Sequence, residues 1–264
     1  MHTTRTFGTV PIAVTSRVPE SPHRTHLVFI HMSWGGAWAF KRYMKFFAGR
    51  GYACHAVDLR GHGNSGGSVE GASMQDYVND VRTAVTGLGL ENTVVIGHSM
   101  GGLISLMYGA QFKPHGIASL DGSPPKETQG TNEEKSYPPS YVPTDAGMPK
   151  NPLKAMSAFS DLPPMRLMQM KFALGVESGV ARSDRKRGIS IPKEQLSQPL
   201  LFIGAERGAS VPFGIGIEKM SAQAAYYGTD AVEIKGASHP GLLIGVYWKR
   251  SAEAILQWLQ KNQW

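Results

Sequence analysis

Short apolar runs alternate with stretches of helical spacing along most of the chain. Six continuous apolar runs predict buried strands, because a strand covered on both faces shows little polar alternation. These runs are 25–31, 53–59, 93–99, 116–121, 198–204 and 231–236. Helical spacing predicts helices at 37–50, 74–88, 100–111 and 245–260, and residues 5–30 are expected to form short strands.

The alternation of these elements indicates the fold class. Strands that alternate with helices favour an α/β protein with a doubly wound, mostly parallel sheet. Ser73 precedes the second helical stretch and is its expected N-cap. Residues 1–122 and 199–264 are expected to form this core. Its active site should lie at the carboxyl ends of the parallel strands.

Residues 123–198 interrupt the pattern. They hold 10 of the 17 prolines and no predicted strand, so we expect a lid inserted into the core. Residues 162–176 have the spacing of an amphipathic helix, with Met165, Met168 and Phe172 on one face. This face either packs on the core or lines an adaptable apolar substrate channel, in which Met165 and Met168 would contact the substrate.

Charge narrows the set of partners only slightly. The formal net charge is +7, and the positive residues are scattered apart from one dense run at 182–187. This run is expected to be a solvated basic loop, with a docking patch for an acidic partner as the alternative. Neither zinc-finger spacing nor an RNA-binding aromatic motif accompanies it, so no nucleic-acid partner is expected.

The remaining composition points to an enzyme in the cytoplasm. Cys54 is the only cysteine, so no disulfide can form within the chain. No run approaches 18 apolar residues, and the N-terminus shows no signal-like apolar stretch, so neither a membrane span nor a signal peptide is expected. The sequence leaves the oligomeric state open.

The strongest chemical signal is the segment 97–101, Gly-His-Ser-Met-Gly, between a predicted strand and a predicted helix. This is the context of a nucleophile elbow, a sharp turn that presents the hydroxyl of Ser99 above the sheet. Glycines two residues to either side avoid clashes in such a turn. The backbone N–H of Met100 would then face an oxyanion formed beside Ser99.

These residues make the chain resemble the α/β-hydrolase superfamily, in its serine esterase and lipase-like branch, over 25–122 and 198–260. His31 with Gly36-Ala37-Trp38 looks like the oxyanion loop of the esterase and hydroxynitrile-lyase branch. The segment 58–65, Asp-Leu-Arg-Gly-His-Gly-Asn-Ser, resembles a family loop that is structural. The resemblance implies that the base follows the last strand, where His239 lies.

The resemblance leaves the triad acid between two candidates. The family usually places an Asp after the fifth of the predicted strands, but Gly208 stands where we expect it and Glu206 lies two residues earlier. Asp121 ends the fourth strand, where some α/β-hydrolases keep the acid, and it is favoured over Glu206. Either carboxylate would fix the tautomer of His239 and stabilise its charged form.

The oxyanion loop departs from the family pattern at Met32, which replaces a glycine. The second oxyanion donor is expected to be the backbone N–H of Ser33, partnering that of Met100. Met32 would reshape the acyl pocket, and Trp34 would add an aromatic wall. Both are therefore candidate substrate-binding residues.

These residues together predict a serine hydrolase that cleaves moderately apolar carboxylic esters through an acyl-enzyme on Ser99, with neither metal nor cofactor. Cleavage of a carbon–carbon bond is an alternative on the same fold. Hydroxynitrile-lyase chemistry is disfavoured, because the threonine and lysine it uses are replaced by Met32 and Pro240. A non-catalytic ligand receptor is a further alternative, which turnover of p-nitrophenyl esters would exclude.

Overall fold

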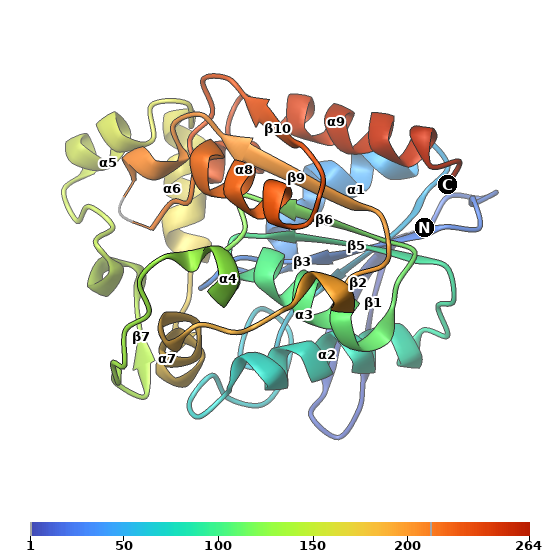
Figure 1. Ribbon diagram of the computed structural model, residues 1–264, viewed down its shortest axis with the longest axis horizontal. Helices are drawn as coiled ribbons and strands as arrows, with labels where there is room; N and C mark the ends of the chain where they lie inside the picture. The colour runs from blue at the N-terminus through green and yellow to red at the C-terminus, as the bar shows by residue number, and fades with distance from the viewer. Residues whose placement is uncertain (1, 212) are drawn as a thin grey trace.

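The computed structural model describes residues 2–211 and 213–264 and is built on a single large sheet (Figure 1). Eight strands lie in the order β1-β2-β4-β3-β5-β6-β9-β10. The pairs β1–β2 and β2–β4 are antiparallel, and the other five are parallel. The strands are β1 (His2–Phe7), β2 (Ile12–Arg17), β3 (His26–Ile30), β4 (Ala53–Val57), β5 (Thr93–His98), β6 (Gly116–Leu120), β9 (Leu200–Ala205) and β10 (Ala231–Ile234). The predicted mostly parallel α/β sheet is confirmed.

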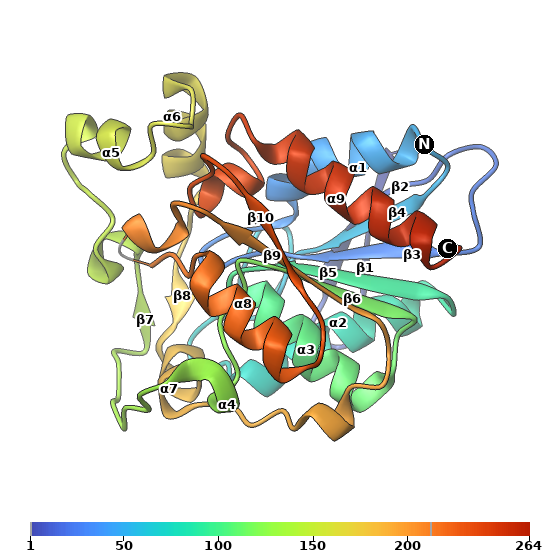
Figure 2. The same ribbon diagram turned by 45° about the horizontal axis from the view of Figure 1, so that its top comes forward.

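Helices cover both faces of this sheet, as Figures 1 and 2 show. Alternate residues of β3 define the two layers. Leu27 and Phe29 pack with α1 and α9, whereas Val28 and Ile30 pack with α2, α3 and α8. The helices of the core are η1 (Ala37–Phe40), α1 (Lys41–Ala48), α2 (Met74–Gly87), α3 (Met100–Phe112), η4 (Gly208–Ser210), α8 (Ile217–Tyr226), η5 (Pro240–Leu242) and α9 (Trp248–Lys261).

Local sequence signals set several of these boundaries. The six predicted buried strands are found within two residues of their expected ends. Ser73 caps α2, because its hydroxyl accepts the N–H of Asp76, and Asp76 accepts the N–H of Ser73 in return. The helix expected over 37–50 begins as the 3₁₀ turn η1 before it continues as α1.

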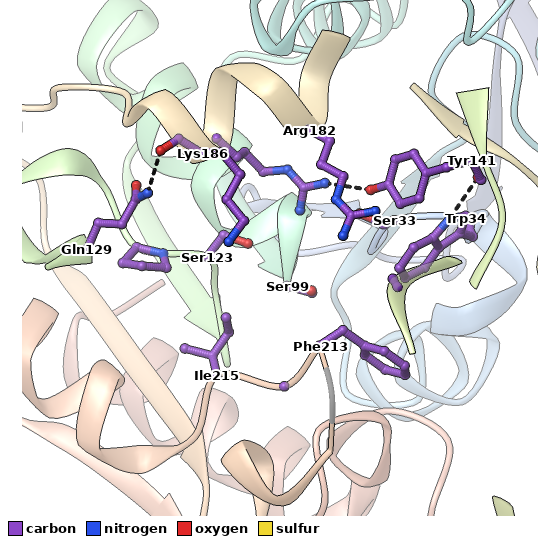
Figure 3. Close-up of a pocket in the computed structure, with 14 residues that line it drawn as sticks. Ser33, Trp34, Ser99, Ser123, Gln129, Tyr141, Arg182, Lys186, Phe213 and Ile215 are labelled. Atoms are coloured by element: carbon purple, nitrogen blue, oxygen red, sulfur yellow. Dashed lines mark hydrogen bonds between the residues drawn. The ribbon is translucent and has the colours of Figure 1, made fainter. Parts of the chain in front are cut away.

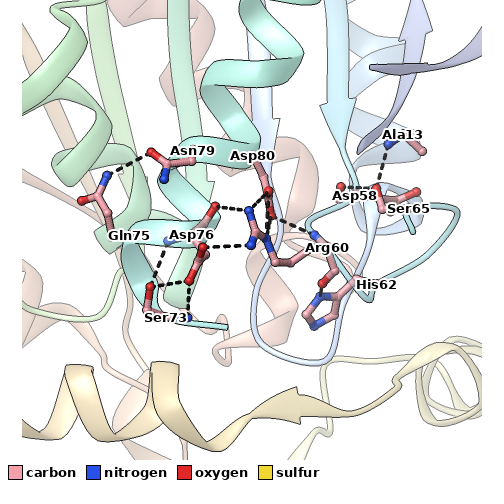
Figure 4. A network of polar contacts seen from close by, with 10 residues as sticks. All are labelled: Ala13, Asp58, Arg60, His62, Ser65, Ser73, Gln75, Asp76, Asn79 and Asp80. Atoms are coloured by element: carbon pink, nitrogen blue, oxygen red, sulfur yellow. Dashed lines mark hydrogen bonds and ion pairs between the residues drawn. The ribbon is translucent and has the colours of Figure 1, made fainter. Parts of the chain in front are cut away.

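The loop after β4 is held by a polar network (Figure 4). The Arg60 guanidinium contacts Asp80 at 2.8 Å and Asp76 at 2.8 Å, and both carboxylates belong to α2. Asp58 accepts the backbone N–H of Ala37 at 2.6 Å. These contacts fix the loop against α2 and the turn before α1, which is a structural role.

Residues 123–198 add no strand to the large sheet. Their elements are α4 (Lys126–Gln129), β7 (Ser140–Tyr141), η2 (Pro143–Ala146), α5 (Pro152–Ala158), α6 (Pro164–Ala173), β8 (Glu177–Ser178), α7 (Gly179–Arg187) and η3 (Lys193–Gln195). The expectation of no strand is wrong only for the short antiparallel pair β7–β8. In Figure 1 most of this segment lies where the parallel strands end, on the side opposite both chain termini.

The basic run at 182–187 is not a loop. It forms most of helix α7, which begins after Ser178, whose hydroxyl accepts the N–H of Ala181 at 3.2 Å. Arg185, Lys186 and Arg187 occupy the last turn, where cations interact favourably with the carbonyl end of the helix. The N-cap and this charge distribution explain why the run is helical.

No helix among residues 2–211 and 213–264 combines the length and the apolar character needed to cross a bilayer.

Candidate active site

Ser99 lies at a sharp turn between β5 and α3. Its backbone has φ 57° and ψ −119°, a left-handed region that a side chain occupies only under strain. The flanking glycines are required by space: a Cβ on Gly97 would lie 2.0 Å from the carbonyl oxygen of Gly101, and one on Gly101 would lie 2.3 Å from that of Ile30. The turn therefore has the geometry of a nucleophile elbow.

Asp121 and His239 meet at the carboxyl ends of the strands. The Nδ1 atom of His239 lies 2.5 Å from Oδ2 of Asp121, and both side chains are buried. Asp121 also accepts the backbone N–H groups of Gly216 at 2.8 Å and Ala205 at 3.2 Å. Burial opposes ionisation of Asp121, but the hydrogen bond and charge of His239 and the backbone donor outweigh it and lower its pKa. The ionised acid can only accept, so Nδ1 carries the proton and Nε2 can act as a base.

Glu206 lies elsewhere. Its side chain is exposed and accepts the backbone N–H of Gly236 at 2.7 Å. Of the two candidate acids, the structure thus brings Asp121 to His239 and leaves Glu206 at the surface after β9. The carboxylate of Glu206, directly after β9, therefore hydrogen bonds to the turn after β10.

Two buried residues that the sequence did not single out hold the His239 loop. Asp161 accepts the N–H and the hydroxyl of Ser238 at 2.9 and 2.6 Å. His98 donates from Nε2 to the carbonyl oxygen of His239 at 3.0 Å. Burial lowers the pKa of His98 to about 3, so it is neutral. His98 could have been found from its place beside Ser99, whereas no local signal marks Asp161.

The two residues that are predicted to supply the oxyanion donors contact each other through their side chains. The hydroxyl of Ser33 contacts the sulfur of Met100 at 3.5 Å, which joins the loop after β3 to the elbow. The next residue, Trp34, has φ 62° and donates its backbone N–H to Glu177 at 3.3 Å and its indole N–H to the carbonyl of Tyr141 at 3.1 Å. The segment 123–198 therefore fixes the conformation of this loop.

A small apolar cavity, of about 30 Å³, lies beside Ser99 and His239. Its lining includes the predicted pocket residues Met32 and Trp34. Other apolar side chains come from the segment 123–198 and the chain after β9: Pro143, Met148, Met170, Leu174 and Phe213.

The expected role of Met165 and Met168 in substrate binding is wrong. Both side chains are exposed, by 67% and 54%, and neither lines a cavity around Ser99. Helix α6 instead buries Leu167 and Met170. Apolar residues occur on both sides of this helix, so their spacing alone does not identify the side that packs inward.

A larger cavity, of about 310 Å³, also has Ser99 in its lining. Figure 3 shows the side chains of Arg182 and Lys186 directed toward it, with Ser99 at its base. Arg185 also lines it, and its lining contains no carboxylate. The lining of this cavity is thus cationic, because α7, which is predicted to be a solvated loop, supplies three positive side chains.

The mostly parallel sheet and the elbow after β5 define a protein with the α/β hydrolase fold. A family model described as alpha/beta hydrolase fold matches residues 25–149. The matched part is slightly less than half of the chain, and the fold agrees with the resemblance at the elbow.

Comparison with known proteins gives partial matches in sequence and nearly complete ones in structure. YisY, an AB hydrolase superfamily protein of Bacillus subtilis, is 34% identical over 107 residues, 40% of this chain and 40% of that protein. The monoacylglycerol lipase of Mycolicibacterium smegmatis is 32% identical over 117 residues, 42% of this chain and 41% of that protein. A thermophilic esterase from Thermogutta terrifontis has a TM-score of 0.72 at 18% identity, covering 99% of both chains. The chain thus matches less than half the length of these curated relatives.

Proposed function

We propose that this chain is a serine hydrolase that cleaves carboxylic esters through an acyl-enzyme on Ser99. The observation that carries the proposal is the Asp121–His239 hydrogen bond at 2.5 Å, beside a cavity that His239 and Ser99 both line. The names of matched relatives, which include a lipase and an esterase, support the same class.

The first half of the reaction forms the acyl-enzyme. The Ser99 oxygen attacks the ester carbonyl while its proton passes to Nε2 of His239. Asp121 holds the ring in the required tautomer and stabilises the imidazolium. The backbone N–H groups of Ser33 and Met100 stabilise the oxyanion. His239 then gives its proton to the leaving alcohol oxygen as the carbon–oxygen bond breaks.

The second half releases the acid. A water molecule gives a proton to His239 and attacks the acyl carbonyl, and the same proton returns to the Ser99 oxygen as the ester bond breaks. In this proposal residues 123–198 form a lid over the site. Met148, Met170 and Leu174 of this segment line the apolar cavity, which supports that role.

The test is the substitution Ser99→Ala, with Ser251→Ala as the matched control. Ser251 is also a buried serine, but it lies on α9 and lines neither cavity beside Ser99. Ser99→Ala should lower the hydrolysis of p-nitrophenyl acetate on the order of 10⁴-fold and abolish labelling by a fluorophosphonate. Ser251→Ala should keep both. Undiminished hydrolysis or labelling in Ser99→Ala would refute the assignment.

A further inference from the structure

The cations of α7 make the larger cavity beside Ser99 positively charged. Arg182, Arg185 and Lys186 line the larger cavity together with Ser99, and its lining contains no Asp or Glu among the residues that the structure describes. A concave site lined by one sign of charge attracts ligands of the opposite sign. From this arrangement we propose that the acyl part of the ester substrate carries an anionic oxyacid group, a carboxylate or a phosphonate-like group, bound by Arg182 with Arg185 and Lys186.

Arg182 is the cation best positioned to bind an anionic ligand. Its guanidinium lies over the rings of Tyr137 at 4.3 Å and Tyr141 at 4.5 Å, which hold it in place through cation–π contacts. Among the residues the structure describes, it makes no ion pair with a carboxylate. A positioned guanidinium offers parallel N–H donors that match an oxyacid group.

The other two cations are already partly engaged. Arg185 donates to the Tyr141 hydroxyl at 2.9 Å, and its charge acts on the buried Glu177. Lys186 lies 3.9 Å from Glu133, in a pair that is about half exposed and therefore weak. They add positive potential to the cavity, whereas Arg182 supplies the direct contact.

The position of His239 indicates which part of the ester, the acyl part or the alcohol part, carries the negative charge. It must protonate the leaving alcohol oxygen, so the alcohol part lies on the side that His239 lines. That side is the small apolar cavity, and His239 does not line the cationic one. The two cavities share Ser33, Trp34, Ser99 and Phe213, so a carbonyl beside Ser99 would have a small alcohol on one side and a larger anionic acyl group on the other.

This inference rests on the proposed ester hydrolysis, and its test compares matched esters. Monoethyl glutarate and ethyl glutaramate differ only in a carboxylate against a neutral amide on the acyl side. We expect kcat/KM for release of ethanol to be about 10- to 100-fold higher for the carboxylate, the range of a charge-assisted hydrogen bond. Ethyl 3-phosphonopropanoate tests the second anion, and preference for either anion over the amide supports the proposal.

Variants of α7 show whether Arg182 is responsible. Arg182→Gln should reduce the preference to about twofold, mainly by lowering kcat/KM for monoethyl glutarate, and Arg182→Lys should retain part of the preference. Arg187→Gln is the matched control, because Arg187 is an exposed cation of the same helix outside the cavity. Equal losses on charged and neutral esters in Arg182→Gln would overturn the proposal. A wild-type enzyme that prefers the amide, or that prefers 4-acetoxybutanoate over 4-acetoxybutanamide more strongly, would overturn it too.

A binding measurement separates this inference from the proposed function. Glutarate should bind the Ser99→Ala protein in calorimetry, and Arg182→Gln in that background should weaken binding about 10-fold or more. If no ester is hydrolysed but glutarate binding depends on Arg182, the proposed function fails and the anion site stands. If esters are hydrolysed without preference and glutarate does not bind, only the anion site fails.

Discussion

Two buried carboxylate–histidine pairs occur among the residues that the structure describes, and one of these two faces a cavity beside a nucleophile. Asp121 pairs with His239 at 2.5 Å, and Glu177 pairs with His62 at 3.4 Å. Both carboxylates are fully buried and accept backbone N–H groups. Burial opposes ionisation of both carboxyl groups, but their pKa values are lowered, because His239 hydrogen bonds to Asp121 and the charge of His62 lies 3.4 Å from Glu177.

The pairs differ in what the second ring nitrogen can reach. His239 uses Nδ1 for Asp121 and lines a cavity with Ser99. His62 faces Glu177 through Nε2 and the carbonyl of Arg60, 3.0 Å away, through Nδ1. Both nitrogens of His62 face protein groups, so it cannot pass a proton to a substrate. A carboxylate–histidine pair therefore indicates catalysis only together with a cavity and a nucleophile.

The second pair joins separate parts of the fold instead. Glu177 accepts the hydroxyl of Tyr77 on α2 at 2.6 Å and the N–H of Trp34 in the oxyanion loop at 3.3 Å. It comes from β8, inside the segment 123–198. Glu177 thus connects that segment to the core and to the loop that holds a proposed oxyanion donor.

The largest effect is expected from Asp121→Asn, with Glu206→Gln beside it. Asp121→Asn should lower kcat on p-nitrophenyl acetate by about 10⁴-fold, because an amide no longer holds His239 in the right tautomer. Glu206→Gln should change kcat less than twofold, since its carboxylate contacts only a surface turn. Similar losses in the two variants would show that neither carboxylate is the triad acid.

A smaller effect, on stability rather than chemistry, is expected from Glu177→Gln. Breaking a buried ion pair on one side leaves the other charge without its partner, which costs about 3 kcal/mol of the free energy of unfolding. Urea unfolding at pH 6 measures this loss. The control Glu253→Gln removes an exposed pair with Lys249 and should cost less than about 0.5 kcal/mol. A loss for Glu177→Gln as small as the control's would mean that the pair does not hold the fold.

The smallest and most specific effect is the pH dependence of that loss. The pKa of Glu177 is lowered from 4.5 to about 2, so its contribution is complete above pH 4.5 and is lost as the pH falls toward 2. The pKa of His62 is raised above 6.5, so its contribution is complete below that pH and is lost as the pH rises through the higher value. The stability difference between wild type and Glu177→Gln should therefore be greatest between about pH 4.5 and 6.5. A difference independent of pH from 3 to 9 would contradict it.

The sequence predicts those parts of the site that depend on local geometry. Gly97, Ser99 and Gly101 predict the elbow because the turn itself needs them, and His239 follows the last strand. The choice between Asp121 and Glu206 depends on how the loops after β6, β9 and β10 meet, which no local pattern encodes. The fold class follows in the same way from the alternation of elements.

Positions on helix surfaces were the least predictable. Arg182 was expected on a solvated loop, because charge density alone does not show which side of a helix lies against a cavity. Met165 and Met168 are predicted to face the substrate, but they are exposed. Apolar residues occur on both sides of α6, so their spacing does not show which side packs inward. The orientation of both helices is set by contacts between residues that are distant in sequence. One such contact joins Glu177, which lies just before α7, to Tyr77 of α2.

The anchoring of Glu177 also bears on how substrates reach Ser99. Lifting residues 123–198 away from the core would separate the Glu177 carboxylate from three partners in the core at once, Trp34, Tyr77 and His62. Such a movement is costly compared with passage through the cavity that already stands open along α7. In the proposed function, residues 123–198 would then stay closed over the site, and the width and charge of the cavity along α7, rather than a hinge movement, would determine which substrates reach Ser99.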